Sequence, residues 1–192
     1  MTYNRSLILF SAFVAFGMTC FVIVRLGFYP VAMVNFNVIT AAEMEKNAVA
    51  TENYFRNLSL LYGSDSDAMD KEESRKEIRR AALDKLISEV LIYEELSGRV
   101  ENFQLIAENK IREALNEKEK LDDGIKKLYG LTILEFKNQV LLPQAYQEIL
   151  EGRLFLKNEN FKAWLDDSRV KARIFILVPD LMWSDKLIKL RN

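Results

Sequence analysis

Carboxylates are the side chains of this sequence best placed to do chemistry, because it contains no histidine and a single cysteine, Cys20. A Ser-His-Asp triad, a Cys-His pair and the common zinc sites are therefore excluded. Adjacent acidic pairs, which could share general acid and base work, occur at Glu72–Glu73, Glu94–Glu95, Asp122–Asp123 and Asp166–Asp167. Adjacent residues of a helix do not face one another, so we interpret these pairs as solvated faces. The sequence predicts no catalytic residue, no metal site and no cofactor.

The charge pattern argues against nucleic acid as a partner. The chain has 27 basic and 28 acidic residues, and setting aside Arg5 and Arg25 leaves 25 basic residues after position 30. The densest charge cluster, KEESRKEIRR at 71–80, mixes acids with bases, as a solvated helix face does. No basic field exists that would attract phosphates.

An uncharged apolar run, from Leu7 to Val24, lies between Arg5 and Arg25. At about 1.5 Å per residue it spans roughly 27 Å as a helix, close to the thickness of a bilayer's hydrocarbon core. A cleaved signal peptide has a shorter apolar stretch followed by a small-x-small site, whereas VRLGFYP follows this run. We expect residues 1–30 to be an uncleaved anchor with its helix at about 7–24. A cleaved signal and a buried core helix are the alternatives.

The orientation of this anchor depends on few charges. Arg5 and the amino terminus lie on one side, and Arg25 lies on the other, which is nearly a tie by the positive-inside rule. The short tail before the helix favours an N-terminus in the cytoplasm and a large part, residues 31–192, outside it.

Helical periodicity fills most of the 162 residues after position 30, enough for one domain with a real core. Capping boxes at Thr40 with Glu43, and at Thr132 with Glu135, mark two helix starts. Gly98 is expected to end the second helix, and Pro143 to kink the fifth. The expected helices cover 41–62, 71–97, 103–118, 121–128, 132–155 and a short stretch after Asn158.

The sequence predicts two strands, at 31–40 and 170–178, because both segments are rich in β-branched and apolar residues. A lone strand leaves its backbone groups unpaired, so we expect these two to pair and to close the domain. The tail, 179–192, would then lie beyond the closing strand and be dispensable for folding. Its apolar residues can form a stripe on a short amphipathic helix: Leu181, Trp183, Leu187 and Leu190.

Three motifs, in this order, resemble the N-terminal chaperone domain of SurA, PrsA and PpiD, a family of bacterial extracytoplasmic chaperones and peptidyl-prolyl isomerases. VAMVNFNVITAAE at 31–43 is similar to the family's opening VAxVNGxxITxxE, ALDKLISEVLI at 82–92 to ALxxLIxxxLL, and YGLTILEF at 129–136 to a later helix start. The resemblance covers about 31–177. It implies a mainly α fold: a transmembrane helix, then a multi-helix domain at 31–178 closed by pairing of its first and last short strands.

The sequence departs from the family in two places. Phe36 replaces the family's turn glycine, so we expect Asn37 to take the positive φ that glycine would supply. Ile174 follows Arg173 where the family's parvulin isomerase domain begins with Arg-His. With no histidine in the chain, we expect that domain to be absent and the protein not to be an enzyme.

The resemblance implies a single-pass protein of the bacterial inner membrane, whose periplasmic domain acts as an ATP-independent chaperone. Its partners would be unfolded or nascent secreted and envelope polypeptides. The resemblance also allows the protein to form a homo-oligomer. Client binding requires exposed apolar surface. The candidates are Met44, Phe55, Tyr62, Phe136 and Tyr146, each of which can instead be a core residue.

One alternative function is that of a structural or assembly subunit that holds a dedicated membrane partner, which the apolar stripe of the tail favours. The other is an isomerase relative without catalytic residues.

Overall fold

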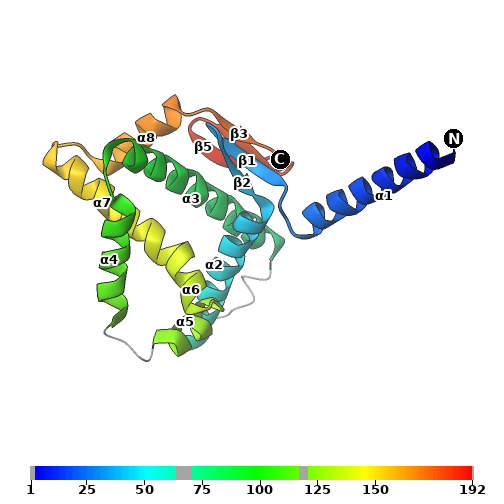
Figure 1. Ribbon diagram of the computed structural model, residues 1–192. Coiled ribbons are helices and arrows are strands. Elements are labelled where there is room, and N and C mark those ends of the chain that lie inside the picture. Colours follow the sequence, from blue (N-terminus) through cyan, green and yellow to red (C-terminus); the bar gives the residue numbers. More distant parts are fainter. Residues whose placement is uncertain (1–2, 64–70, 117–120, 192) are drawn as a thin grey trace.

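The computed structural model describes residues 3–63, 71–116 and 121–191, and its described part is mainly helical (Figure 1). The helices are α1 (Tyr3–Arg25), α2 (Ala41–Leu61), α3 (Glu72–Arg99), α4 (Phe103–Asn116), α5 (Leu121–Tyr129), α6 (Ile133–Phe136), the π-helical turn η2 (Lys137–Leu141), α7 (Leu142–Leu156) and α8 (Phe161–Lys171). The strands are β1 (Pro30–Val34), β2 (Asn37–Thr40), β3 (Ile174–Ile176), β4 (Leu181–Ser184) and β5 (Leu187–Leu190).

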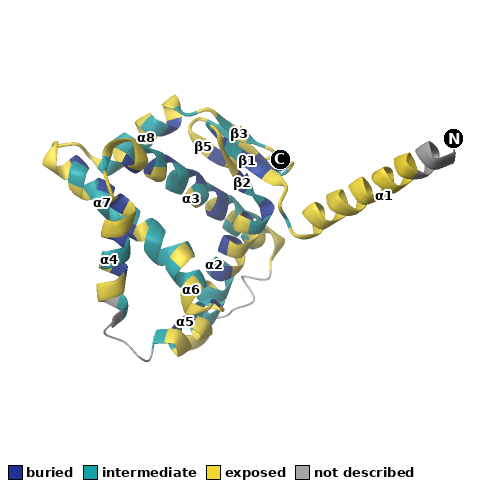
Figure 2. Cartoon of the chain, viewed as in Figure 1, coloured by how far each residue is buried: buried dark blue, intermediate teal, exposed yellow. Residues whose placement is uncertain are grey.

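Helix α1 stands apart from the rest of the chain. From Ile8 to Arg25 its residues are exposed, and the helix projects from the domain (Figure 2). Among the described residues it is the one helix long and apolar enough to cross a membrane, over the 18 residues Ile8–Arg25. A helix of this kind is compatible with a transmembrane segment or a signal sequence.

The first capping box forms at Thr40, as the sequence predicts. The Thr40 hydroxyl accepts from the backbone N–H of Glu43, and the Glu43 carboxylate accepts from the Thr40 N–H at 2.8 Å. The same reciprocal pair joins Thr132 and Glu135 at the start of α6. Both predictions are confirmed, because a capping box depends only on residues three positions apart.

The other helix ends differ more from expectation. Gly98 lies inside α3, which continues to Arg99, because Val100 rather than a glycine closes the helix with its N–H on the Leu96 carbonyl. Helix α8 continues to Lys171, so positions 170 and 171 are helical and not part of a strand. Residues 64–70, between the helices expected over 41–62 and 71–97, and the end of the helix expected over 103–118 lie outside the described residues.

A small three-stranded sheet joins segments far apart in the chain, in the order β2-β1-β3. Both neighbours run antiparallel to β1, with Ala32 opposite Ile39 on one side and opposite Ile176 on the other. The β1–β2 turn does not use Asn37. Asn35 has the positive φ, of 54°, because the two-residue loop consists of Asn35 and Phe36 and its first position must be left-handed.

The C-terminal tail forms a β-hairpin and not an amphipathic helix. Strands β4 and β5 pair with Leu181 opposite Leu190, and the turn residues Asp185 and Lys186 both have positive φ, as a type I′ turn requires. Leu181 and Ile188 are fully buried in the same core as β1 and α3. The hairpin therefore packs into the core of the domain, which argues against the expectation that the tail is dispensable for folding.

Candidate functional site

A cleft of about 220 Å³ lies where the edge strand β2 meets α3 and α7. β2 contributes its free edge, because β1 occupies its other side. Val38 is half exposed on this edge, and Tyr93 of α3 is also exposed. The cleft is lined by Asn37, Val38, Ile39, Glu43, Leu86, Glu89, Val90, Tyr93 and Tyr146.

Two aromatic rings, Tyr93 and Tyr146, lie at one end of this cleft and pack against a third, Phe103. Tyr93, Phe103 and Tyr146 contact one another edge to face, with ring centroids 5.2 to 5.9 Å apart. Phe103 is buried and anchors the group, and the side-chain amide of Gln104 donates to the Tyr93 hydroxyl at 2.9 Å. Burial raises the pKa of Tyr146 above its usual value, with Tyr93 and Glu108 adding to the effect. Tyr146 is thus a neutral, amphipathic contact surface at neutral pH.

Carboxylates provide the polar part of the cleft. Burial raises the pKa of Glu89 above its usual value, and the nearby Glu43 carboxylate acts in the same direction, whereas Lys85 opposes it. The Lys85 ammonium lies 3.2 Å from Glu89 Oε1. Glu43 and Glu89 both line the cleft and no basic residue does, so the described lining carries acceptors for N–H groups and cations.

Lys85 also supports the wall of the cleft from behind. Its ammonium donates to Asn47 Oδ1 at 2.7 Å and to the Gln139 carbonyl at 2.9 Å. Gln139 lies four residues before Pro143, which has no N–H to complete an α-helical bond to that carbonyl. The π-helical turn η2 falls at this point, in agreement with the irregularity expected at Pro143, and the lysine satisfies the released acceptor.

A polar cluster at the β1–β2 turn holds the edge strand in place. Asn35 and Asn37 donate their amides to the two carboxylate oxygens of Glu94, at 2.7 and 2.6 Å. The side-chain oxygen of Asn35 also accepts from the backbone N–H of Arg173 at 3.0 Å. One asparagine therefore ties the turn to α3 and to the start of β3, which fixes β2 beside the cleft.

The residues predicted from the sequence to contact clients do not form one surface. Met44 is buried in the main core, so it offers no exposed surface. Phe55 and Phe136 belong to a second aromatic group, in which Tyr54 and Tyr129 stack at 5.0 Å. Tyr62 is highly exposed just after α2. Of the five, Tyr146 alone lines the cleft.

Sequence reasoning missed most of the cleft. Val38 and Tyr93 are the exposed apolar residues beside Tyr146, and neither was a candidate. The available signal was the alternation in β2, which places Val38 on the opposite face from buried Ile39. The arrangement can hold an extended segment through apolar contacts and hydrogen bonds. Among the described residues no group of carboxylates and cysteine could hold a metal ion.

Comparisons with family models, with curated proteins and with solved structures find no match to this chain.

Proposed function

We propose that this protein is a membrane-anchored, chaperone-like binder that holds apolar segments of unfolded or partly folded polypeptides outside the cytoplasmic membrane, without ATP or covalent chemistry. The resemblance to the SurA, PrsA and PpiD chaperone domain supports the class of function, and the apolar length of α1 supports the anchor. The client site is the cleft between β2, α3 and α7.

The observation that carries the proposal is the combination of exposed apolar side chains with a free strand edge in one concave place. Val38 and Tyr93 are exposed in the cleft although both are apolar or aromatic. An extended peptide can add to an unpaired strand edge through its backbone, while side chains enter adjacent pockets. Backbone contacts do not depend on sequence, as promiscuous binding requires.

The lining also indicates which segments bind best. Glu43 and Glu89 are the charged residues of the cleft. Burial raises the pKa of Glu89 although the Lys85 ammonium lies 3.2 Å away, so its carboxylate gains from a further cation nearby. Preferred clients are apolar segments that carry a lysine or arginine. Binding weakens with salt if this charge contact forms.

The test is suppression of aggregation by the full chain in lipid nanodiscs, measured by light scattering with two unrelated chemically unfolded proteins. The wild type should delay aggregation of both. A double variant, Val38→Ser with Tyr93→Ser, should lose most of this effect. The matched control is Phe155→Ser with Leu156→Ser, which removes two residues that are 80% and 83% exposed at the end of α7, outside the cleft lining, and should behave as the wild type.

Equal loss in both double variants would point to general surface hydrophobicity and not to the cleft. No suppression by the wild type would overturn the proposal. A photo-crosslinking amino acid that replaces Tyr93 distinguishes, in cells, a chaperone from a dedicated assembly subunit. Many crosslinked products support a chaperone, whereas one product identifies a dedicated assembly partner. The apolar stripe of the tail, which favoured this alternative, belongs to a hairpin that packs into the core. It therefore no longer supports a free docking helix.

A further inference from the structure

The outer face of the β2-β1-β3 sheet is an apolar surface that no described element covers. The ladder places Val38, Met33 and Phe175 side by side across the three strands. Phe175 is 57% exposed, Leu177 beyond it is 52% exposed, and Phe36 at the turn is 94% exposed. The opposite row, Ala32 with Ile39 and Ile176, faces the core. Val38 also lines the client cleft, so we call the other residues, Phe36, Met33, Phe175 and Leu177, the outer sheet face.

Arg173 places a positive charge at the β3 margin of this face. Along β3 and just before it, the exposed positions are Arg173, Phe175 and Leu177, whereas Lys171 at the end of α8 is paired with Asp167. No acidic residue occupies an outward position of the described sheet. An apolar surface with a cationic neighbour matches the boundary between acyl chains and anionic headgroups.

The connection to α1 is short and held at both ends. The helix ends in a Schellman motif: the Phe28 N–H bonds the Ile23 carbonyl, the Gly27 N–H bonds the Val24 carbonyl, and Gly27 has a φ of +69°. On the other side, the first N–H groups of α2 donate to the linker, Ala41 to the Tyr29 carbonyl at 3.0 Å and Ala42 to the Gly27 carbonyl at 2.9 Å.

This linker leaves the domain no room to stand away from a membrane that α1 crosses. From Arg25 to Pro30 the chain can reach at most roughly 18 Å when fully extended, and the headgroup layer is itself roughly 5–8 Å thick on each side. The exposed linker residues Leu26, Phe28 and Tyr29 then lie at headgroup depth, where aromatic side chains are favoured.

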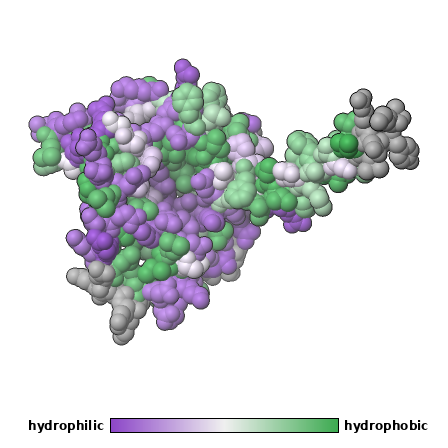
Figure 3. Space-filling model, in the orientation of Figure 1, coloured by the Kyte–Doolittle hydropathy of each residue, from purple (hydrophilic) through white to green (hydrophobic). Residues whose placement is uncertain are grey.

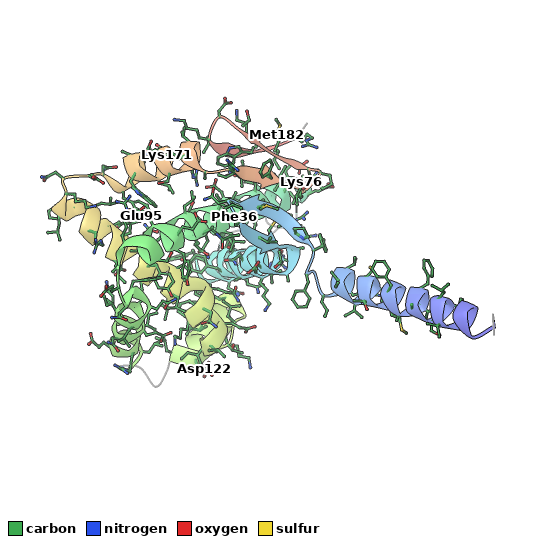
Figure 4. The ribbon with its side chains drawn as sticks, turned by 45° about the horizontal axis from the view of Figure 1, so that its top comes forward. Phe36, Lys76, Glu95, Asp122, Lys171 and Met182 are labelled. Carbon is green, nitrogen blue, oxygen red and sulfur yellow. The ribbon has the colours of Figure 1, made fainter. Side chains whose placement is uncertain are left out.

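The strands of the sheet also cross the direction of α1, as expected for a sheet that lies along a membrane surface (Figure 1). In Figure 1 the strands β1, β2 and β3 run across the direction of α1 and do not continue it, and α4, α5 and α6 lie on the far side of the domain. Figure 3 shows hydrophobic colour over the sheet region and along α1. In Figure 4 the labelled Phe36 lies on the sheet and Lys171 on neighbouring α8, whereas Asp122 lies at the distant end with α5.

We propose that the outer sheet face docks on the surface of an anionic lipid bilayer, so that the domain lies flat on the membrane with the helices α4 to α6 directed away from it. This inference rests on membrane insertion of α1, which is part of the proposed function. It is independent of client binding. The docked sheet would fix the edge of β2, and with it the client cleft, close to the membrane surface.

Depth measurement by spin labelling tests the docking with the full chain in vesicles of phosphatidylcholine and phosphatidylglycerol. In a Cys20→Ser background, a nitroxide is placed at Phe175→Cys and, as a control, at Phe155→Cys. Collisions with oxygen, which concentrates in lipid, are compared with collisions with a water-soluble nickel chelate. The label at 175 should lose nickel accessibility, and the label at 155 should keep it. Arg173→Glu should partly restore nickel accessibility at 175.

The possible outcomes distinguish membrane docking of this face from three alternatives: no membrane insertion of α1, client binding by this face, and contact with a second copy of the chain. Vesicle flotation comes first: a chain that does not float disproves insertion of α1 and the docking with it. A chain that floats but leaves position 175 as open to nickel as position 155 overturns the docking and leaves the anchor intact. Protection at 175 that requires added unfolded protein assigns this face to clients. Spin-spin broadening that disappears on dilution with unlabelled chain assigns it to a second copy.

Discussion

The guanidinium of Arg169 lies 2.8 Å from the carboxylate of Asp84 and joins α8 to α3 in the interior of the domain. Arg169 is only 6% exposed. The same nitrogen donates to the Ser88 hydroxyl at 2.8 Å, and the other terminal nitrogen approaches the Lys186 carbonyl in the β4–β5 turn at 3.5 Å. One buried side chain thus connects the last helix, the central helix and the C-terminal hairpin.

Replacing this arginine should strongly destabilise the protein. Arg169→Ala leaves the Asp84 carboxylate without its partner, and breaking a buried ion pair on one side costs about 3–5 kcal/mol. Chemical unfolding followed by circular dichroism measures the change. On the same helix, Lys171→Ala removes an exposed ion pair with Asp167 and should cost less than about 1 kcal/mol. Similar losses in both variants would mean that the Arg169 contacts do not support the fold.

The C-terminal hairpin offers a direct comparison between a buried and an exposed neighbour. Ile188 is fully buried and Leu187 is 49% exposed, although they are adjacent in β5. Ile188→Ala should cost about 2–5 kcal/mol, as core truncations do, whereas Leu187→Ala should cost under about 1 kcal/mol. Thermal unfolding of the two variants measures this. Equal midpoints would show that the tail is dispensable, as the sequence suggests.

The sequence predicts the local features of this fold better than the distant ones. Thr40 and Thr132 mark helix starts correctly, because each box is complete within four residues. The hairpin at 181–190 escapes notice because its turn is Asp185–Lys186, without the glycine or asparagine typical of two positive φ values. The sequence does not predict the cleft for another reason. Val38 and Tyr93 are brought together by packing of β2 against α3, and periodicity within either segment does not reveal this contact between elements.

The free energy of unfolding should fall as the pH rises through the raised pKa of Glu89, which is the opposite of the usual behaviour of a carboxylate. Burial raises the pKa of this carboxyl above its ordinary value of 4.5, so the folded state binds the proton more tightly than the unfolded state. The stability linked to this proton is fully present below the ordinary pKa and is lost as the pH rises through the folded-state pKa. Glu89→Gln, which is neutral throughout, should therefore gain stability relative to the wild type as the pH rises from about 4.5 toward neutrality.

Glu135 provides the opposite control. The N–H and hydroxyl of Thr132 lower its pKa, so its contribution is present above the ordinary pKa and is lost as the pH falls through the lowered one. Denaturant midpoints should therefore separate the two variants by pH: Glu135→Gln should approach the wild type as the pH falls below the ordinary value of 4.5, and Glu89→Gln should gain on the wild type as the pH rises above it. Parallel curves would indicate that Glu89 is fully paired with Lys85 in the folded protein.

Two glycines should respond to the same substitution with opposite signs. Gly130 ends α5 with a φ of +70°, and an added Cβ would lie 2.7 Å from the side-chain nitrogen of Asn53, which donates to the Tyr129 carbonyl. A left-handed alanine costs about 1–2 kcal/mol, and displacing Asn53 adds to this cost. Gly152 lies exposed inside α7 with nothing near its Cβ position, so Gly152→Ala should gain about 0.5–1 kcal/mol from helix propensity. Denaturant unfolding of both variants measures the difference. A Gly130→Ala protein as stable as the wild type would mean that the turn between α5 and α6 does not require the left-handed conformation that packs Tyr129 beside Tyr54.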